Sequence, residues 1–182
     1  MATRGTYQFV DAETKVTLYV HWDNYLEGAA VYFYNMLTNP SRGNLATQFI
    51  RAVDGAEITK SHAYHGDTEY QYTINGNDAD AYLVVKSVRE KEVVFVGSLV
   101  DFIEKHNENI MHYKPLRKYV SEWGLAQWMT ADMALVHIKD KLATMEKWKD
   151  KHVENWKSYA QNVNSLVKIF PELEQYKVEL VS

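Results

Sequence analysis

Cysteine is absent from this sequence of 182 residues. Its absence excludes disulfides, cysteine-ligated zinc, iron–sulfur clusters and thiol catalysis, and it fits a chain that works in a reducing cytosol. No run approaches the roughly 18 consecutive apolar residues that a membrane-spanning helix needs. The first ten residues lack the apolar segment of a secretory signal. We therefore expect a soluble protein of the cytoplasm that has no membrane contact.

A strong excess of one charge is also missing. The formal net charge is −4 at pH 7, so direct binding to nucleic acid or anionic lipid is not expected. The phosphate loops GxGxxG and GxxxxGK(S/T) do not occur, and neither does the GxSxG turn of serine hydrolases. Because no complete catalytic set is visible, the sequence favours a non-enzymatic protein without a cofactor.

Glycine becomes rare after residue 113. Seven of the eight glycines lie before that point, whereas four of the five tryptophans lie after it. Residues 1–113 carry nine basic and fifteen acidic side chains, while residues 114–182 carry eleven basic and nine acidic side chains. The sequence therefore predicts an acidic, turn-rich domain at 1–113 and a helical oligomerisation region at 114–182.

Alternating apolar residues predict strands in the first domain. Residues 16–22 alternate, so Val20 and Trp22 are expected to face the core while His21 and Asp23 lie on the opposite face. A short strand near residues 7–10 could pair with this one. The same reasoning predicts further strands at 68–74, 81–88 and 92–96.

Helix signals separate these strands. Asn24 is predicted to cap a helix that buries Ala30, Phe33 and Leu37. A second helix is expected at 44–53. A third is expected to begin at Ser98, which Asp101 follows three residues later.

The predicted order of elements is β-β-α-α-β-β-β-α. Because tight turns such as Asn75-Gly76 join consecutive strands, antiparallel pairing is expected. A helix layer on one side would bury the apolar face of the sheet. The predicted fold class is α+β, with a mainly antiparallel sheet of about five strands and an all-helical C-terminal region.

The C-terminal region contains a phased apolar stripe, which is interrupted at Lys149 and His152. It predicts either one long helix, which is typical of a coiled coil, or a helical hairpin that turns at residues 149–151. Both alternatives favour a homo-oligomer, most simply a dimer; a third alternative folds two helices back onto the first domain of a monomer. The predicted oligomerisation residues are Leu135, Ile138, Leu142, Met145, Trp156, Tyr159, Val163 and Leu166.

The densest group of reactive side chains lies at residues 61–70. His62, His65 and Asp67 could hold zinc, manganese or iron if the sheet brought His21 and Asp23 alongside. The spacing matches no specific metal motif. The favoured alternative is that His62 and His65 cap a loop, while Asp67 and Thr68 form side-chain hydrogen bonds to the backbone of a turn.

His21 and Asp23 form a second candidate pair, since they are close enough on one strand face to share a proton. Ser61 could be invoked as a nucleophile, but the turn that would position it is missing. Tyr70, Tyr72 and Tyr82 lie on neighbouring strands. Because the surrounding domain is acidic, a core or protein-contact role is favoured over base stacking.

Two segments carry a resemblance. Residues 19–30 (YVHWDNYLEGAA) and 61–72 (SHAYHGDTEYQY) resemble a group of small phage and bacterial proteins that have motifs like HWDGYPEGA and SHEAHGDTEYRYT. The resemblance covers about residues 3–104, and Asn24 and Leu26 replace the usual Gly and Pro. It implies a phage or mobile-element accessory protein inside a bacterial cell. It implies no catalytic residues.

The sequence thus favours a protein that acts by binding a protein partner in the bacterial host, in its sharpest form an inhibitor of a defence system such as a CRISPR nuclease. The rival is a metal-dependent enzyme that uses the histidine and aspartate cluster. A third interpretation is a small-ligand pocket lined by Trp22 and Tyr25. The predicted binding residues are His21, Asp23, Tyr25, His62, His65, Asp67, Glu69, Tyr70 and Tyr72.

Overall fold

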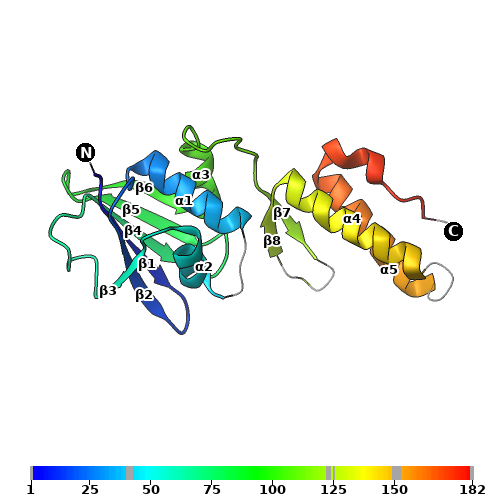
Figure 1. Cartoon of the computed structure of the whole chain (residues 1–182), viewed down its shortest axis with the longest axis horizontal. Helices are drawn as coiled ribbons and strands as arrows, with labels where there is room; N and C mark the ends of the chain where they lie inside the picture. The colour runs from blue at the N-terminus through cyan, green and yellow to red at the C-terminus, as the bar shows by residue number, and fades with distance from the viewer. Residues whose placement is uncertain (1, 40–42, 122–123, 125, 149–152, 181–182) are drawn as a thin grey trace. The chain divides into compact units, whose positions relative to one another are not determined.

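The computed structural model describes residues 2–39, 43–121, 124, 126–148 and 153–180. The chain divides into two compact units, Met1–Tyr113 and Lys114–Ser182 (Figure 1). The division falls where glycine becomes rare in the sequence. No helix in the described ranges is both long enough and apolar enough to cross a membrane.

Unit 1 is an α+β fold built on a six-stranded sheet. The strand order is β3-β2-β1-β4-β5-β6. Its strands are β1 (Gly5–Val10), β2 (Lys15–Val20), β3 (Glu57–Thr59), β4 (Tyr70–Asn75), β5 (Tyr82–Ser87) and β6 (Glu92–Ser98). Its helices are α1 (Leu26–Thr38), α2 (Leu45–Ala52) and α3 (Leu99–Lys105).

The sheet is mixed, because β1 and β4 pair in parallel while every other neighbouring pair is antiparallel. A parallel pair needs a long crossover between its strands. The chain supplies it between β2 and β4, where α1 and α2 lie (Figure 1). The prediction from local turns missed this pair and the short strand β3, since neither is marked by a turn signal.

The parallel pair creates the aromatic core of unit 1. Tyr7 on β1 lies opposite Tyr72 on β4, and their rings stack with centroids 4.6 Å apart. Phe33, Phe49 and Phe102 bring one ring from each helix against this pair, and all five side chains are fully buried. Each such side chain contributes a large apolar area to the core.

The helix caps and buried helix faces predicted from the sequence are found in most of the helices of unit 1. Ala30, Phe33 and Leu37 are buried as predicted. Ser98 and Asp101 form the complete capping box at the start of α3. Asn24 is not the cap of α1, however: Tyr25 takes that position without a side-chain hydrogen bond. The Asn24 side chain is used elsewhere.

At one edge of the sheet, β6 is an apolar strand with a bulge. Val85 pairs with Phe95 and the next residue, Lys86, pairs with Val93, so Val94 is an extra residue in β6. Val93 and Val96 are exposed. The bulge therefore lies within an exposed apolar strand.

Unit 2 is not all-helical, which corrects the prediction. It begins with an antiparallel hairpin of β7 (Arg117–Val120) and β8 (Ala126–Met129). Tyr119 and Met129 point into the core, and Gly124, between the strands, has the positive φ of +73° that favours glycine. The hairpin is followed by α4 (Ala131–Trp148), α5 (Val153–Ile169) and the 3₁₀ helix η1 (Pro171–Tyr176).

Helices α4 and α5 pack against each other, so the single long helix is wrong and the hairpin alternative holds. Lys149, His152 and the proposed turn at 149–151 lie outside the described residues. Four of the predicted oligomerisation residues on the apolar stripe, which we call the seam, are buried within unit 2: Ile138, Met145, Val163 and Leu166. Four others, Leu135, Leu142, Trp156 and Tyr159, are partly buried against the same core. The seam therefore needs no second copy of the chain to cover it.

Candidate functional site

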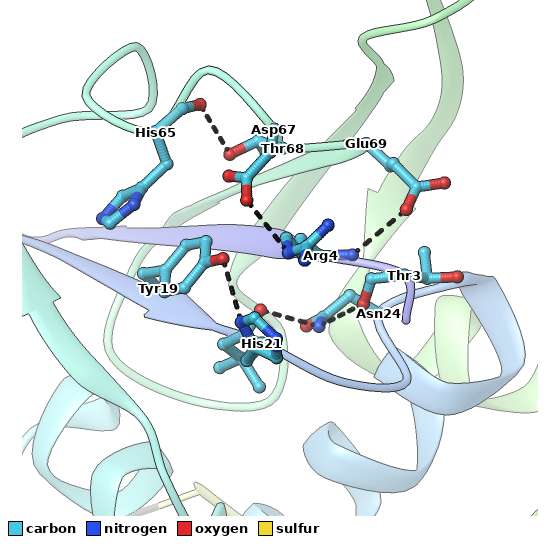
Figure 2. Close-up of polar contacts among 10 residues, drawn as sticks. Thr3, Arg4, Tyr19, His21, Asn24, His65, Asp67, Thr68 and Glu69 are labelled. Carbon is cyan, nitrogen blue, oxygen red and sulfur yellow. Dashed lines mark hydrogen bonds and ion pairs between the residues drawn. The ribbon is translucent and has the colours of Figure 1, made fainter. Parts of the chain in front are cut away.

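The first sequence motif is held by Asn24, whose side chain is fully buried. Its Oδ1 accepts a hydrogen bond from the Tyr7 hydroxyl at 2.7 Å. The two N–H groups of its Nδ2 face the carbonyls of Thr3, Val20 and Trp22 at 2.9, 2.9 and 2.5 Å, so two of these carbonyls share one N–H. Figure 2 shows the contact with Thr3. One side chain thus ties the N-terminal segment to the end of β2.

Tyr72 completes this network by donating its hydroxyl to the Asn24 carbonyl at 2.7 Å. Burial raises the pKa of Tyr7 and Tyr72 well above the usual value, so both hydroxyls keep their protons. Tyr72 is fully buried and cannot contact a partner. Its predicted role as a binding residue is therefore wrong.

The turn between β2 and α1 is unusually tight. Asp23 adopts a positive φ of 53°. A Cβ atom on Gly28 would lie 2.0 Å from the Asp23 carbonyl oxygen, which is far inside van der Waals contact. Only glycine fits at position 28, because any other side chain would collide with the Asp23 backbone.

The second motif forms a loop that lies against the other face of the sheet. His62 Nδ1 is 2.7 Å from the Thr6 hydroxyl on β1, and Nε2 is 3.1 Å from the Thr73 hydroxyl on β4. Burial, helped by the charge of Lys15, lowers the pKa of His62 to about 4. His62 is therefore a neutral side chain that anchors the loop.

A chain of ring contacts then joins the two motifs. The His65 ring stacks on Tyr19 with centroids 3.8 Å apart and 14° between planes. The Tyr19 hydroxyl is 3.3 Å from His21 Nδ1, as Figure 2 shows. His21 meets Trp22 edge-on at 4.5 Å, and at the other end His65 meets Tyr64 edge-on at 5.2 Å. We call these five residues the aromatic ladder: Trp22, His21, Tyr19, His65 and Tyr64.

The two ends of the ladder are open to solvent. The Trp22 side chain is 60% exposed and that of Tyr64 is 58% exposed. The prediction that Trp22 faces the core is wrong, because β2 ends at Val20 and the alternation stops with it. The Lys60 ammonium lies 5.2 Å from the centre of the Tyr64 ring.

Arg4 fastens the loop beside the ladder. Its guanidinium forms an ion pair with Asp67 at 2.9 Å, and its main-chain N–H donates to the Glu69 carboxylate at 3.4 Å (Figure 2). Thr68 donates its hydroxyl to the His65 carbonyl at 3.0 Å. Asp67 and Glu69 are thus engaged in shaping the loop, and His65 Nε2 is 3.1 Å from the Thr59 hydroxyl.

These contacts separate the side chains of the metal hypothesis. His62, His65 and Asp67 each have a different partner, and His21 bonds Tyr19 and not Asp23. Among the residues that the structure describes, no three histidine or carboxylate side chains are grouped so that they could hold a metal ion. Of the alternative bonds expected within the loop, the structure has the one from Thr68 to the His65 carbonyl, whereas His62, His65 and Asp67 bond to residues outside the loop.

The remaining predicted residues lie apart from the ladder. Tyr25 caps α1, and its hydroxyl accepts a hydrogen bond from Asn109 at 3.2 Å. Tyr70 lies on the helix-covered side of β4 with Tyr72, whereas Tyr82 on β5 is exposed on the opposite side. The three tyrosines therefore form no common stacking face, while the small-ligand pocket lined by Trp22 and Tyr25 stays a prediction.

A shallow hollow borders the ladder. It has a volume of about 360 Å³ and is lined by Glu57, Ile58, Thr59, Lys60, Tyr64 and His65. Ile58 on the edge strand β3 is 76% exposed. Asp23, Glu57 and Lys60 are also exposed, so this surface combines apolar side chains with acidic and basic ones.

Sequence reasoning missed Arg4, Tyr19 and Tyr64 as parts of the site. The alternation of residues 16–22 did place Tyr19 and His21 on one face. Nothing local to the sequence indicates that the 60–69 loop returns to that face. Comparison of the chain with protein-family models, curated proteins and solved structures finds no match.

Proposed function

We propose that this chain is a protein-binding protein and that the aromatic ladder is its docking surface. The observation that carries the proposal is the continuous run of ring contacts from Trp22 to Tyr64, whose two end rings are mostly exposed. A monomer gains little from exposing two large aromatic side chains. Tryptophan and tyrosine are among the residues that contribute most to binding at protein interfaces.

The ladder is preorganised for binding. Tyr19 is buried and stacked on His65, and His62 anchors the loop that carries both His65 and Tyr64. Rigid aromatic side chains lose little conformational entropy when a partner covers them. The end rings are therefore held ready for contact.

The charge around the ladder favours a basic partner. Asp23 and Glu57 are exposed near its ends, and residues 1–113 carry an excess of six acidic side chains. Complementary charge speeds the encounter of two proteins and selects among partners. Binding should weaken as the salt concentration rises.

The resemblance supplies a biological setting for this proposal. The two segments that resemble phage and mobile-element proteins supply all five ladder residues, and Tyr19 begins the first segment. The sharper form of the proposal is an inhibitor, in the bacterial cytoplasm, of a host defence protein such as a CRISPR nuclease. A basic nucleic-acid groove on such a protein would suit an acidic, aromatic surface. The oligomer is not carried forward, because its argument depended on an uncovered helical seam.

The test is quantitative affinity capture from a bacterial lysate with three forms of the full chain. These are the unchanged protein, the double variant Trp22→Ala/Tyr64→Ala, and the control Val136→Ala, which removes a side chain that is 68% exposed in unit 2. We expect one basic protein to be captured by the unchanged chain and the control and to be lost with the double variant.

Recovery of the same proteins by all three forms would refute a role for the ladder. Retention of the partner in molar salt would contradict the electrostatic part alone. Because both ladder substitutions are at exposed positions, the double variant is expected to keep its fold, which circular dichroism checks.

A further inference from the structure

Unit 2 contains a cavity of about 160 Å³ between its β-hairpin and its two long helices. β7 and β8 contribute Tyr119 and Gln127, and Ser121 follows β7. Helix α4 contributes His137 and Lys141, which are one turn apart, and α5 contributes Asn162 and Leu166. The lining is therefore polar on three sides, and Leu166 supplies an apolar wall.

The described lining residues include hydrogen-bond donors and a cation but no carboxylate. The Lys141 ammonium lies 5.5 Å from the centre of the Tyr159 ring, which holds it without neutralising it. Within the described part of the chain, the side chains of His137 and Gln127 form no hydrogen bond or ion pair with protein groups. Three donor-bearing side chains thus border the cavity without an acidic counterpart.

A buried polar pair lies at the inner end of the cavity. The Tyr119 hydroxyl donates to Asn162 Oδ1 at 3.1 Å, and Asn162 Nδ2 donates to the Ser158 carbonyl at 3.1 Å. Asn162 is only 7% exposed. An amide group has two N–H donors, and the hydrogen bonds of the described chain engage one of them. A buried donor that stays unused is destabilising unless a water or a ligand accepts its hydrogen bond.

We propose that this cavity binds a phosphate group. Lysine is a point charge suited to phosphate, and amide and imidazole N–H groups bind the remaining oxygens. The absence of a carboxylate from the described lining avoids repulsion. Residues 114–182 also carry more basic than acidic side chains, unlike residues 1–113. This site is in a different unit from the aromatic ladder, so either proposal can fail without the other.

The test is a titration of the full chain with sodium phosphate at constant ionic strength, followed by calorimetry and by amide NMR shifts. We expect saturable binding with a Kd of about 1 mM or tighter. Lys141→Gln should weaken binding about tenfold or more. Lys139→Gln, an exposed position on the same helix, is the matched control and should bind as the unchanged chain does.

Further arms identify the form of the ligand. Binding of glycerol phosphate as tight as that of free phosphate would indicate a phosphate monoester on a larger molecule, whereas preference for free phosphate would indicate the ion itself. Equal binding of acetate would overturn the assignment to phosphate. So would unsaturable shifts, or equal binding by both lysine variants. Unchanged amide spectra away from the cavity confirm that Lys141→Gln remains folded.

Discussion

Each unit buries one asparagine against a tyrosine hydroxyl, and the two asparagines are used differently. Asn24 in unit 1 accepts one hydrogen bond and donates to three carbonyls. Asn162 in unit 2 accepts one and donates one, and it borders a cavity. A fully satisfied buried amide fixes a single local structure, whereas one with spare capacity leaves room for water or a ligand. The asparagine amide therefore has all its hydrogen bonds filled in unit 1, whereas in unit 2, among the described residues, one N–H remains free to bind water or a ligand.

The largest effect is expected when the closed network is broken. Asn24→Ala leaves the buried Tyr7 hydroxyl and Val20 carbonyl without this partner and removes the bonds to two part-buried carbonyls, so the free energy of unfolding of unit 1 should fall by about 3–5 kcal/mol. Hydrogen exchange of amides in β1 and β4 measures it. Exchange in α5 reports on unit 2 and should not change; a loss below about 1 kcal/mol in β1 would show that Asn24 is not the hub.

A second substitution tests the tight turn between β2 and α1 in unit 1. Gly28→Ala places a Cβ atom against the Asp23 carbonyl, and the resulting strain should destabilise unit 1 by about 2–3 kcal/mol. Gly66→Ala is the matched control, because no atom lies within 4 Å of the added Cβ. Urea unfolding compares the two variants, and equal midpoints would contradict the steric argument.

Acid provides a third comparison, since it should loosen the loop of unit 1. The folded-state pKa of His62 is about 4, below its ordinary value, so the unfolded chain binds the proton more tightly. The stabilisation is complete above about pH 6.5 and is lost as the pH falls toward 4; allowing for solvent screening, it amounts to about 1–2 kcal/mol. His62→Gln should flatten this part of the pH profile, measured by urea unfolding from pH 7 to pH 4.5. An unchanged slope would mean that other groups cause it.

Asn162, whose amide has spare hydrogen-bonding capacity, should contribute less to stability than Asn24. Asn162→Ala removes the acceptor of the Tyr119 hydroxyl, but water in the cavity can replace it, so we expect a loss of about 1 kcal/mol. Hydrogen exchange in α5 measures the change. A loss as large as that from Asn24→Ala would erase the contrast between the two units.

The smallest effects are expected at the ion pairs, and they should be alike in the two units. Asp67→Asn breaks the pair with Arg4, and Glu172→Gln breaks the pair with Arg117. Each pair is partly exposed to solvent, so each change should alter stability by less than about 1 kcal/mol. Arg117 lowers the pKa of Glu172, and a larger acid-dependent loss in unit 2 alone would show that this pair has a greater role.

The sequence predicts local structure well and long-range placement poorly. The Ser98–Asp101 capping box and the buried face of α1 follow from residues three or four apart. The parallel pairing of β1 with β4 depends on residues about 65 positions apart, and no turn or periodicity encodes it. The C-terminal stripe predicted helices correctly, but helical spacing alone does not distinguish one long helix from two that pack together.

The candidate site shows the same limit. Both motifs were recognised from their reactive side chains, and the placing of Tyr19 and His21 on one strand face was expected. The docking of His65 on Tyr19 was not, because it depends on the Thr6 and Thr73 hydroxyls that receive His62 on the far side of the sheet. Asn24 was interpreted as a helix cap, the commonest use of that residue before a helix. Its position between Tyr7 and Tyr72 depends on the parallel pairing of β1 with β4, which the local sequence does not indicate.

The extra residue in β6 bears on how the protein behaves when crowded. A regular, exposed apolar edge strand can pair with strands of neighbouring molecules, and repeated addition is the first step toward fibrils. Val94 interrupts the regular spacing of N–H and C=O groups along that border. A straight incoming segment would lose its alignment after a few residues. The extra valine thus allows an exposed apolar edge strand while opposing the continued addition of strands from other molecules.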